Sequence, residues 1–255
     1  MKPRSKAAAL RALEINASLG EARATLAYVE TLYDWDWARS DEDFKRALEL
    51  KPNYAQAHLW YAMHLAAVGR LDAAVEEVKR AEELDPLSPI INTTHGLILY
   101  FGGQYDQATA QFHRVLELDP SFFVAHWELG MVYEQKGMYE QARAEFQRAL
   151  ALSPGNPTIL ESLAEIEAFS GRKSEARNIL QQMIARSKRE FVSPYVLAEL
   201  NLALGDREQA FQWLERAYDR RDNNLIFLNV DPSLRSLHSD PRFRQLSQRM
   251  GLSKE

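Results

Sequence analysis

Three glutamates are the side chains in this sequence that are best placed to do chemistry. Glu161 and Glu165 are four residues apart, about one turn of a helix, and Glu199 lies thirty-four residues after Glu165. Two carboxylates that flank a sugar are the machinery of a glycoside hydrolase. The regular spacing of Glu165 and Glu199 instead indicates a charged stripe along a repeated structure. Such a stripe either faces solvent or contacts a partner, and the sequence leaves both interpretations open.

The six histidines give weak evidence for a metal site. No H-E-x-x-H motif occurs, and the "HWE" at His126 lacks the cysteine ligands of a zinc deaminase, because the chain contains no cysteine. His58, His64 and His95 could share a metal only where helices stack. His58 and His126 are two intervals of thirty-four residues apart, which indicates a structural role. We therefore predict no metal site and no cofactor.

Motifs for phosphate binding and for nucleophilic catalysis are also missing. The patterns G-x-x-x-x-G-K-[ST], G-x-G-x-x-G and G-x-S-x-G do not occur. The paired glycines of "FGGQYD" fall in a turn that recurs along the chain. The sequence thus predicts no catalytic residue, and we expect a protein that is not an enzyme.

Composition limits the remaining classes of function. The chain has 255 residues, of which 46% are hydrophobic and 26% charged, as in a folded protein. The formal net charge of −5 argues against binding of nucleic acid, which needs a basic face. No window approaches eighteen consecutive apolar residues, so we expect no membrane span. Together with the absence of cysteine, these features predict a cytoplasmic protein.

A period of thirty-four residues runs through the chain and must position these side chains. The short tails "ELKP", "ELDP", "ELDP" and "ALSP" end at Pro52, Pro86, Pro120 and Pro154. Glycines recur at the same interval, with a small residue five positions later and a large apolar residue four positions beyond that. The glycines are Gly69, Gly103, Gly137, Gly171 and Gly205.

Each period predicts a hairpin of two antiparallel helices. The glycine can adopt the left-handed conformation that ends the first helix, and the proline prevents the second helix from continuing. The small residues are placed where two helices cross closely. One hairpin leaves an apolar face uncovered, so neighbouring hairpins must stack. The predicted fold is therefore all-α, a solenoid of stacked hairpins.

This pattern resembles the tetratricopeptide repeat (TPR). The best copy runs from Phe123 to Pro154 and carries Leu129, Gly130, Tyr133, Gly137, Tyr139, Ala142, Phe146, Ala149 and Pro154 at the family's spacings. The resemblance covers nearly the whole chain. It implies a right-handed superhelix whose concave inner face binds a protein or a peptide. We expect six repeats, in residues 19–222.

Both ends of the chain depart from the period. Residues 1–18 resemble the second helix of an incomplete repeat, so we expect a fragment or a shortened relative of a longer protein. Ala27 lies eight residues before Trp35, where other units have seven, which places one inserted residue in "YDWDWA". Residues 223–255 contain two Asp-Pro steps and a short amphipathic helix from Pro241. That segment is predicted to be irregular and to cap the last hairpin with its helix.

The amino-acid sequences of several segments resemble those of the TPR arrays at the C-terminal end of bacterial regulators. Among these segments are "YDWDWA", "HLWYAMHLAAVGR" and "VDPSLRSLHSDPRFRQL". In such proteins an N-terminal winged-helix DNA-binding domain, serine/threonine kinase or nucleotide cyclase carries the activity. The resemblance implies that this chain is the regulatory or sensing arm of a signalling protein. The sequence identifies neither the partner, nor the signal, nor the effector domain.

The resemblance also assigns the inward positions of the first helices, which form a predicted partner-binding groove. The groove residues are Tyr28, Leu59, Met63, Thr93, Leu97, Tyr100, Trp127, Met131, Glu161, Glu165, Tyr195 and Glu199. This lining is apolar and aromatic in the first four units and acidic in the last two. We expect it to select a basic or amphipathic peptide or helix. Chaperone-binding members grip a chain terminus with Lys, Asn and Arg, and these positions carry none of the three.

Two other functions compete with a partner-binding groove. The uncovered apolar face of the half-repeat could pair with a second copy and give a homo-oligomer. The acidic groove and the histidines could instead bind a small molecule. RNA binding conflicts with the negative charge of the chain.

Overall fold

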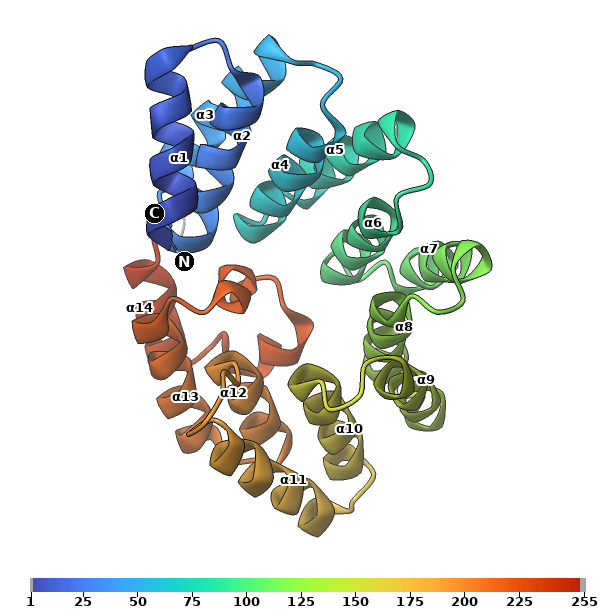
Figure 1. Cartoon of the computed structure of the whole chain (residues 1–255). Coiled ribbons are helices and arrows are strands. Elements are labelled where there is room, and N and C mark those ends of the chain that lie inside the picture. The colour runs from blue at the N-terminus through green and yellow to red at the C-terminus, as the bar shows by residue number, and fades with distance from the viewer. Residues whose placement is uncertain (1, 253–255) are drawn as a thin grey trace.

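The computed structural model describes residues 2–252 of the chain. In this part of the chain all regular elements are helical and there is no strand. The helices pair into antiparallel hairpins that stack one after another (Figure 1). The predicted all-α solenoid is therefore confirmed.

Six hairpins follow one another between a leading helix and an irregular C-terminal part. The leading helix is α1 (Lys2–Ile15). The hairpins are α2 (Gly20–Val29) with α3 (Trp37–Leu50), α4 (Ala55–Ala67) with α5 (Leu71–Leu84), α6 (Pro89–Phe101) with α7 (Tyr105–Leu118), α8 (Phe123–Gln135) with α9 (Tyr139–Leu152), α10 (Pro157–Phe169) with α11 (Lys173–Arg186), and α12 (Pro194–Ala203) with α13 (Arg207–Arg220). The C-terminal part contains the 3-10 helices η2 (Asn223–Phe227) and η3 (Pro232–Leu237) and the helix α14 (Pro241–Arg249).

The two helices of a hairpin approach closely where a small residue faces a large one sixteen positions later. A Cβ atom on Gly96 would lie 2.4 Å from Cε1 of Phe112, and one on Gly130 would lie 2.5 Å from Cε1 of Phe146. Four other hairpins have alanine at this position. In three of them the facing residue is a smaller valine or leucine, and in the first, Ala27 stands seventeen residues before Phe44 because of the inserted residue. The three pairs with valine or leucine are Ala62 with Val78, Ala164 with Leu180, and Ala198 with Leu214. The size of one residue thus compensates for the size of the other.

The first hairpin contains the extra residue that its spacing indicates. After α2 the chain forms a π-helix, η1 (Glu30–Asp34), a geometry that accommodates one additional residue in a helical turn. Trp35 then has a φ of 57°, the left-handed conformation that Gly69 adopts in the next unit with a φ of 75°. A non-glycine residue in this conformation costs ~1–2 kcal/mol. Packing of the Trp35 side chain must therefore hold it in place.

A polar pair joins α4 to α5, and an equivalent pair joins α8 to α9. Nδ1 of His58 lies 2.6 Å from Oε2 of Glu77, and Nδ1 of His126 lies 2.7 Å from Oε2 of Glu145. The other ring nitrogen of His58 is 2.9 Å from the carbonyl oxygen of Pro52, the proline that ends the preceding repeat. These histidines therefore have structural partners, as their phasing indicates.

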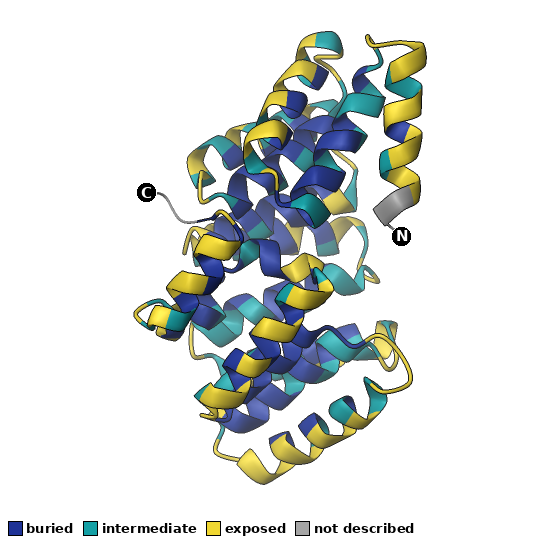
Figure 2. Ribbon diagram, turned by 90° about the vertical axis from the view of Figure 1, so that its left-hand side faces the viewer, coloured by how far each residue is buried: buried dark blue, intermediate teal, exposed yellow. Residues whose placement is uncertain are grey.

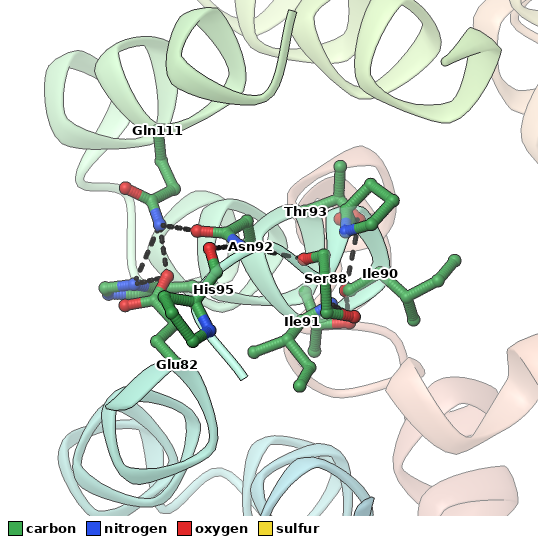
Figure 3. A network of polar contacts seen from close by, with 11 residues as sticks. Glu82, Ser88, Ile90, Ile91, Asn92, Thr93, His95 and Gln111 are labelled. Carbon is green, nitrogen blue, oxygen red and sulfur yellow. Dashed lines mark hydrogen bonds and ion pairs between the residues drawn. The ribbon is translucent and has the colours of Figure 1, made fainter. Parts of the chain in front are cut away.

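In the hairpin between these two, an amide pair replaces the histidine and the glutamate (Figure 3). The Gln111 side chain donates to Glu82 and lies 3.4 Å from Oδ1 of Asn92 and 3.3 Å from Nδ1 of His95. His95 is itself 2.9 Å from Glu82. The network links α5, α6 and α7 and fixes how one hairpin stacks on the next.

The array curls until its last elements meet the first hairpin (Figure 1). The Tyr218 ring packs 5.1 Å from the Trp35 ring, and the guanidinium carbon of Arg221 lies 3.9 Å from the centre of that ring. Nε1 of Trp37 donates to the carbonyl oxygen of Met250 over 2.6 Å. These contacts join the last elements of the array to its first hairpin.

Buried residues run between the helices of the stack, while exposed residues follow its outer surface (Figure 2). The leading helix α1 packs on α2 and keeps an exposed outer face. Two large apolar side chains belong to that face, Leu10 with 39% and Ile15 with 76% of its surface exposed.

Candidate functional site

A cavity of about 390 Å³ lies on the concave side of the array. Its walls come from α6, α8, α10 and α12, the first helices of four successive hairpins, and from the segment that follows α13. Eight of the twelve predicted groove residues line it, namely Leu97, Tyr100, Trp127, Met131, Glu161, Glu165, Tyr195 and Glu199. The thirty-four-residue period places these side chains together, because it returns each first helix to the same side of the stack.

The C-terminal segment enters the concave side and closes part of the predicted groove. The Phe227 ring packs 4.8 Å from the Phe101 ring at the end of α6. The hydroxyl of Tyr195 donates to Oδ2 of Asp231 over 2.8 Å. Phe227 also packs against the buried clusters of the second and third hairpins. The groove is therefore shorter than expected, and the open part is the cavity.

The apolar side of the cavity is formed by α6 and α8. Trp127 and Met131 are one turn apart on α8 and half-buried, and Phe123 lies one turn before Trp127. Nε1 of Trp127 donates to Oγ of Ser162 over 3.0 Å, so the indole is held against α10. Tyr100 is buried beneath this wall. These side chains present aromatic faces and a thioether to whatever occupies the cavity.

The same cavity is also lined by acidic side chains. Five carboxyl groups line it, on Glu134, Glu161, Glu165, Glu199 and Asp231. Only 3% of Glu161 and 7% of Glu165 is exposed, so the interpretation of these residues as a solvated stripe is wrong. Asp231 and Ser233 of the C-terminal segment line the same cavity. None of the lining residues is Lys, Arg or His.

Burial and mutual repulsion shift the titration of these carboxyl groups. Burial, followed by repulsion from Glu199 and Asp231, raises the pKa of Glu134 to about 8. Burial, followed by repulsion from Glu165 and Glu199, raises the pKa of Glu161 well above its ordinary value. Burial likewise raises the pKa of Glu165 and of Glu199. These shifts favour protonated carboxyl groups in the cavity, and a positive charge beside them would favour their ionised form.

The other four predicted groove residues lie outside the cavity. Tyr28 stacks on Trp60 with ring centres 4.6 Å apart, and Leu59 is buried in the core of the second hairpin. Met63 is half-buried. The hydroxyl of Thr93 donates over 2.8 Å to a backbone carbonyl one turn earlier in its own helix (Figure 3). We therefore restrict the candidate site to the residues of the cavity.

Several residues that line the cavity were not predicted from the sequence. Glu134 lies thirty-four residues after Tyr100, so the repeat phase that selected Tyr100 also selects Glu134. Phe227 and Asp231 follow the last repeat, where the period has ended and gives no signal. Only the path of the chain brings these two residues to the site.

The histidines do not form a metal centre in the described part of the chain. No group of three or more His, Asp or Glu side chains there is arranged to hold a metal ion. His64 is buried and lies 2.9 Å from the hydroxyl of Thr31, and burial lowers the pKa of His64 to about 4. His58 and His95 have different partners, Glu77 and Glu82.

Comparison with known proteins identifies the repeat. Family models described as tetratricopeptide repeat match residues 32–89, 93–157 and 135–191, which together make up more than half of the chain. The chain belongs to the tetratricopeptide repeat family. TPR proteins are generally non-enzymatic scaffolds for protein–protein interaction. No curated protein matches the sequence.

Solved structures of other TPR proteins share the fold. PilF of Pseudomonas aeruginosa is 19% identical with a TM-score of 0.56, over 82% of this chain and 95% of its own. PilW, a type IV pilus biogenesis factor, is 20% identical with a TM-score of 0.60, over 86% of this chain and 97% of its own. A TPR protein from Parabacteroides merdae is 14% identical with a TM-score of 0.66, over 96% and 90%. At these identities the likeness concerns the fold alone.

No helix among the described residues of this TPR chain combines the length and the apolar character needed to cross a bilayer.

Proposed function

We propose that this TPR array is the non-enzymatic interaction arm of a bacterial signalling protein or transcriptional regulator in the cytoplasm. It binds a peptide or helix of a partner protein in the cavity on its concave side. The ligand presents an apolar anchor to Trp127 and Met131 and a basic side chain to the glutamates of α10 and α12. The proposed regulatory role rests on the sequence segments that resemble those of the TPR arrays in bacterial regulators.

The observation that carries the proposal is the combination of an aromatic wall and an acidic wall in one cavity. Aromatic side chains in a concave pocket are the usual energetic centre of a protein–protein interface. The volume of about 390 Å³ accommodates one or two side chains of a partner rather than a whole helix. The partner chain is therefore expected to cross the mouth of the cavity and insert its anchors.

Selection from a random peptide display library tests this function directly. The complete chain is immobilised, and bound peptides are expected to share a Lys or Arg close to a large apolar residue. Fluorescence anisotropy then measures the affinity of a selected peptide for single variants. Met131→Ala should weaken binding about tenfold or more, because it removes part of the anchor pocket.

The repeat supplies a matched control for this variant. Met63 holds the same position two units earlier and lies outside the cavity. Met63→Ala should leave peptide affinity unchanged. Equal losses in Met63→Ala and Met131→Ala, or selected peptides without a shared basic residue, would count against the proposed cavity.

Self-association is the second candidate function. The exposed apolar side chains Leu10 and Ile15 on α1 favour it, because a second copy could cover them. Sedimentation equilibrium at rising concentration should then show a dimer that Ile15→Lys converts to a monomer. A monomer at every concentration would eliminate this function.

A further inference from the structure

The acidic side of the cavity contains an oxygen atom whose hydrogen-bonding capacity is unused. Only 3% of Glu161 is exposed; no N–H or hydroxyl group among the described residues donates to its Oε1, and its carboxyl group shares a hydrogen bond with that of Glu165. Its Oε2 lies 3.5 Å from Oγ of Ser162, at the limit of a hydrogen bond. Burying a carboxylate oxygen without a partner costs free energy. A ligand that donates a hydrogen bond to this oxygen would recover that cost.

The neighbouring carboxyl groups concentrate negative charge around the same point. They belong to three helices and to the C-terminal segment, and they are Glu134 on α8, Glu165 on α10, Glu199 on α12 and Asp231. Oε1 of Glu199 already accepts a hydrogen bond from Ser233 over 2.8 Å. The lining contains no basic side chain that could neutralise the group. The missing charge must therefore come from a ligand if these carboxyl groups are to ionise together.

The aromatic part of the lining suits a cation that also has an apolar part. Trp127, Phe123 and Phe101 contribute aromatic rings to the lining, and the Trp127 indole donates to Ser162, the neighbour of Glu161 on α10. Aromatic faces attract ammonium and guanidinium groups and also bury alkyl chains. The volume of about 390 Å³ is within the range of small-molecule sites.

We infer that the cavity binds an organic cation, a protonated amine or guanidinium on a short alkyl chain, with its charged head on Glu161 and Glu165 and its chain against Trp127. The cation is either a free amine or the Lys or Arg side chain of a partner peptide. Only the second source rests on the proposed function. In either case Oε1 of Glu161 accepts a hydrogen bond from the ligand.

Binding of the cation is linked to release of protons. Burial raises the pKa of the carboxyl groups of Glu161 and Glu165, and a bound cation lowers it again, so protons leave as the ligand binds. Affinity therefore increases with pH as these carboxyl groups lose their protons. The titratable groups that face the ligand are Tyr100, Glu134, Glu161, Glu165, Tyr195, Glu199 and Asp231.

Isothermal titration calorimetry on the complete chain tests the inference. The probes are 1,5-diaminopentane, agmatine and the blocked amino acids N-acetyl-lysine methylamide and N-acetyl-arginine methylamide, with 1-pentanol as the neutral comparison. At least one cationic probe should bind, at least tenfold more tightly than pentanol, and titrations in buffers of different ionisation enthalpy should reveal released protons. Preference for the free amines or for the blocked amino acids identifies the source of the cation.

Two variants at the site and one elsewhere complete the test. Glu161→Gln and Glu165→Gln should each weaken the cationic probe at least tenfold. Glu128→Gln removes another buried carboxyl group from α8, outside the cavity, and should leave the affinity unchanged. Circular dichroism melting confirms that each variant is folded.

The results separate this inference from the proposed function. If none of the cationic probes binds, if pentanol binds equally well, or if both site variants fold and bind like the unmodified chain, the inference is wrong. Selected peptides that bind through Met131 without needing Glu161 would then still support the interaction arm. Amines that bind when peptide selection fails would support the cation site and remove the peptide function.

Discussion

Gly130→Ala is the substitution that tests the packing of this repeat array most sharply. A Cβ atom at position 130 would lie 2.5 Å from Cε1 and 2.6 Å from Cδ1 of Phe146, whose side chain is fully buried. Ordinary carbon contacts are ~3.5–4.0 Å, so the ring or the helix must move by about 1 Å. Overpacking of this kind costs ~1–3 kcal/mol, and the large overlap favours the upper end.

Alanine also gains ~1 kcal/mol over glycine in a helix interior, which offsets part of the cost. The expected net loss in the free energy of unfolding is therefore about 2 kcal/mol. Urea denaturation followed by circular dichroism measures it. The sign of the result is informative, because helix propensity alone predicts that the variant is more stable.

Other repeats of the chain suggest a second substitution that should restore the stability lost in Gly130→Ala. In two of the hairpins that have alanine at this position, at Ala164 and Ala198, the facing residue is a leucine. Phe146→Leu should therefore tolerate Gly130→Ala, and the double variant should be at least ~1 kcal/mol more stable than the sum of the two single changes. A Gly130→Ala variant as stable as the unmodified chain, or two changes that simply add, would refute the explanation of the small residues.

Three further predictions concern the cavity, the junction of the two ends and a buried histidine. Because the pKa of Glu134 is raised from 4.5 to about 8, the folded chain holds a proton there that the unfolded chain has released. This stabilisation is complete below pH 4.5 and is lost as the pH rises through about 8, at most ~3 kcal/mol of it by pH 7. Glu134→Gln should flatten that part of the pH profile in urea denaturation, whereas a change at the exposed Glu140 should not. Trp35→Gly relieves the left-handed strain but removes the ring that packs on Tyr218. We expect a net loss of ~2 kcal/mol, since burial of a large aromatic ring outweighs the strain, and small-angle scattering should show a more open particle. An unchanged radius of gyration would show that this contact does not hold the ends together. Burial lowers the pKa of His64 to about 4, so its contribution has the opposite sign and is lost as the pH falls from 6.5 to about 4. A proton-exchange or chemical-shift titration that finds this ring charged at pH 6 would contradict its buried place.

The periodic part of the fold could be predicted because each repeat carries the residues that end its helices and allow them to pack. Glycine marks the end of a first helix, and the glycine or alanine seven positions earlier marks the close crossing inside the hairpin. Even the irregularity at Trp35 leaves a trace, since Ala27 stands one residue too early. Local geometry of this kind depends on residues that are near in the sequence.

The shape of the concave side could not be predicted in the same way. It depends on how far the array curls, which sums small rotations over all hairpins. The path of the last segment brings Phe227 against Phe101 across more than a hundred residues, and no period connects them. For the same reason Glu161 and Glu165 were expected in a groove but their burial was not foreseen.

The five tryptophans of the chain provide the most direct test of the central claim, that the concave cavity is the partner site. Each indole N–H gives one signal in a nitrogen–proton correlation spectrum, and Trp127 is the only tryptophan among the residues that line the cavity. On addition of a display-selected peptide, the Trp127 signal should shift in proportion to occupancy while those of Trp37 and Trp213 stay in place. A peptide that binds and shifts the other indoles while the Trp127 signal does not move would contradict the account.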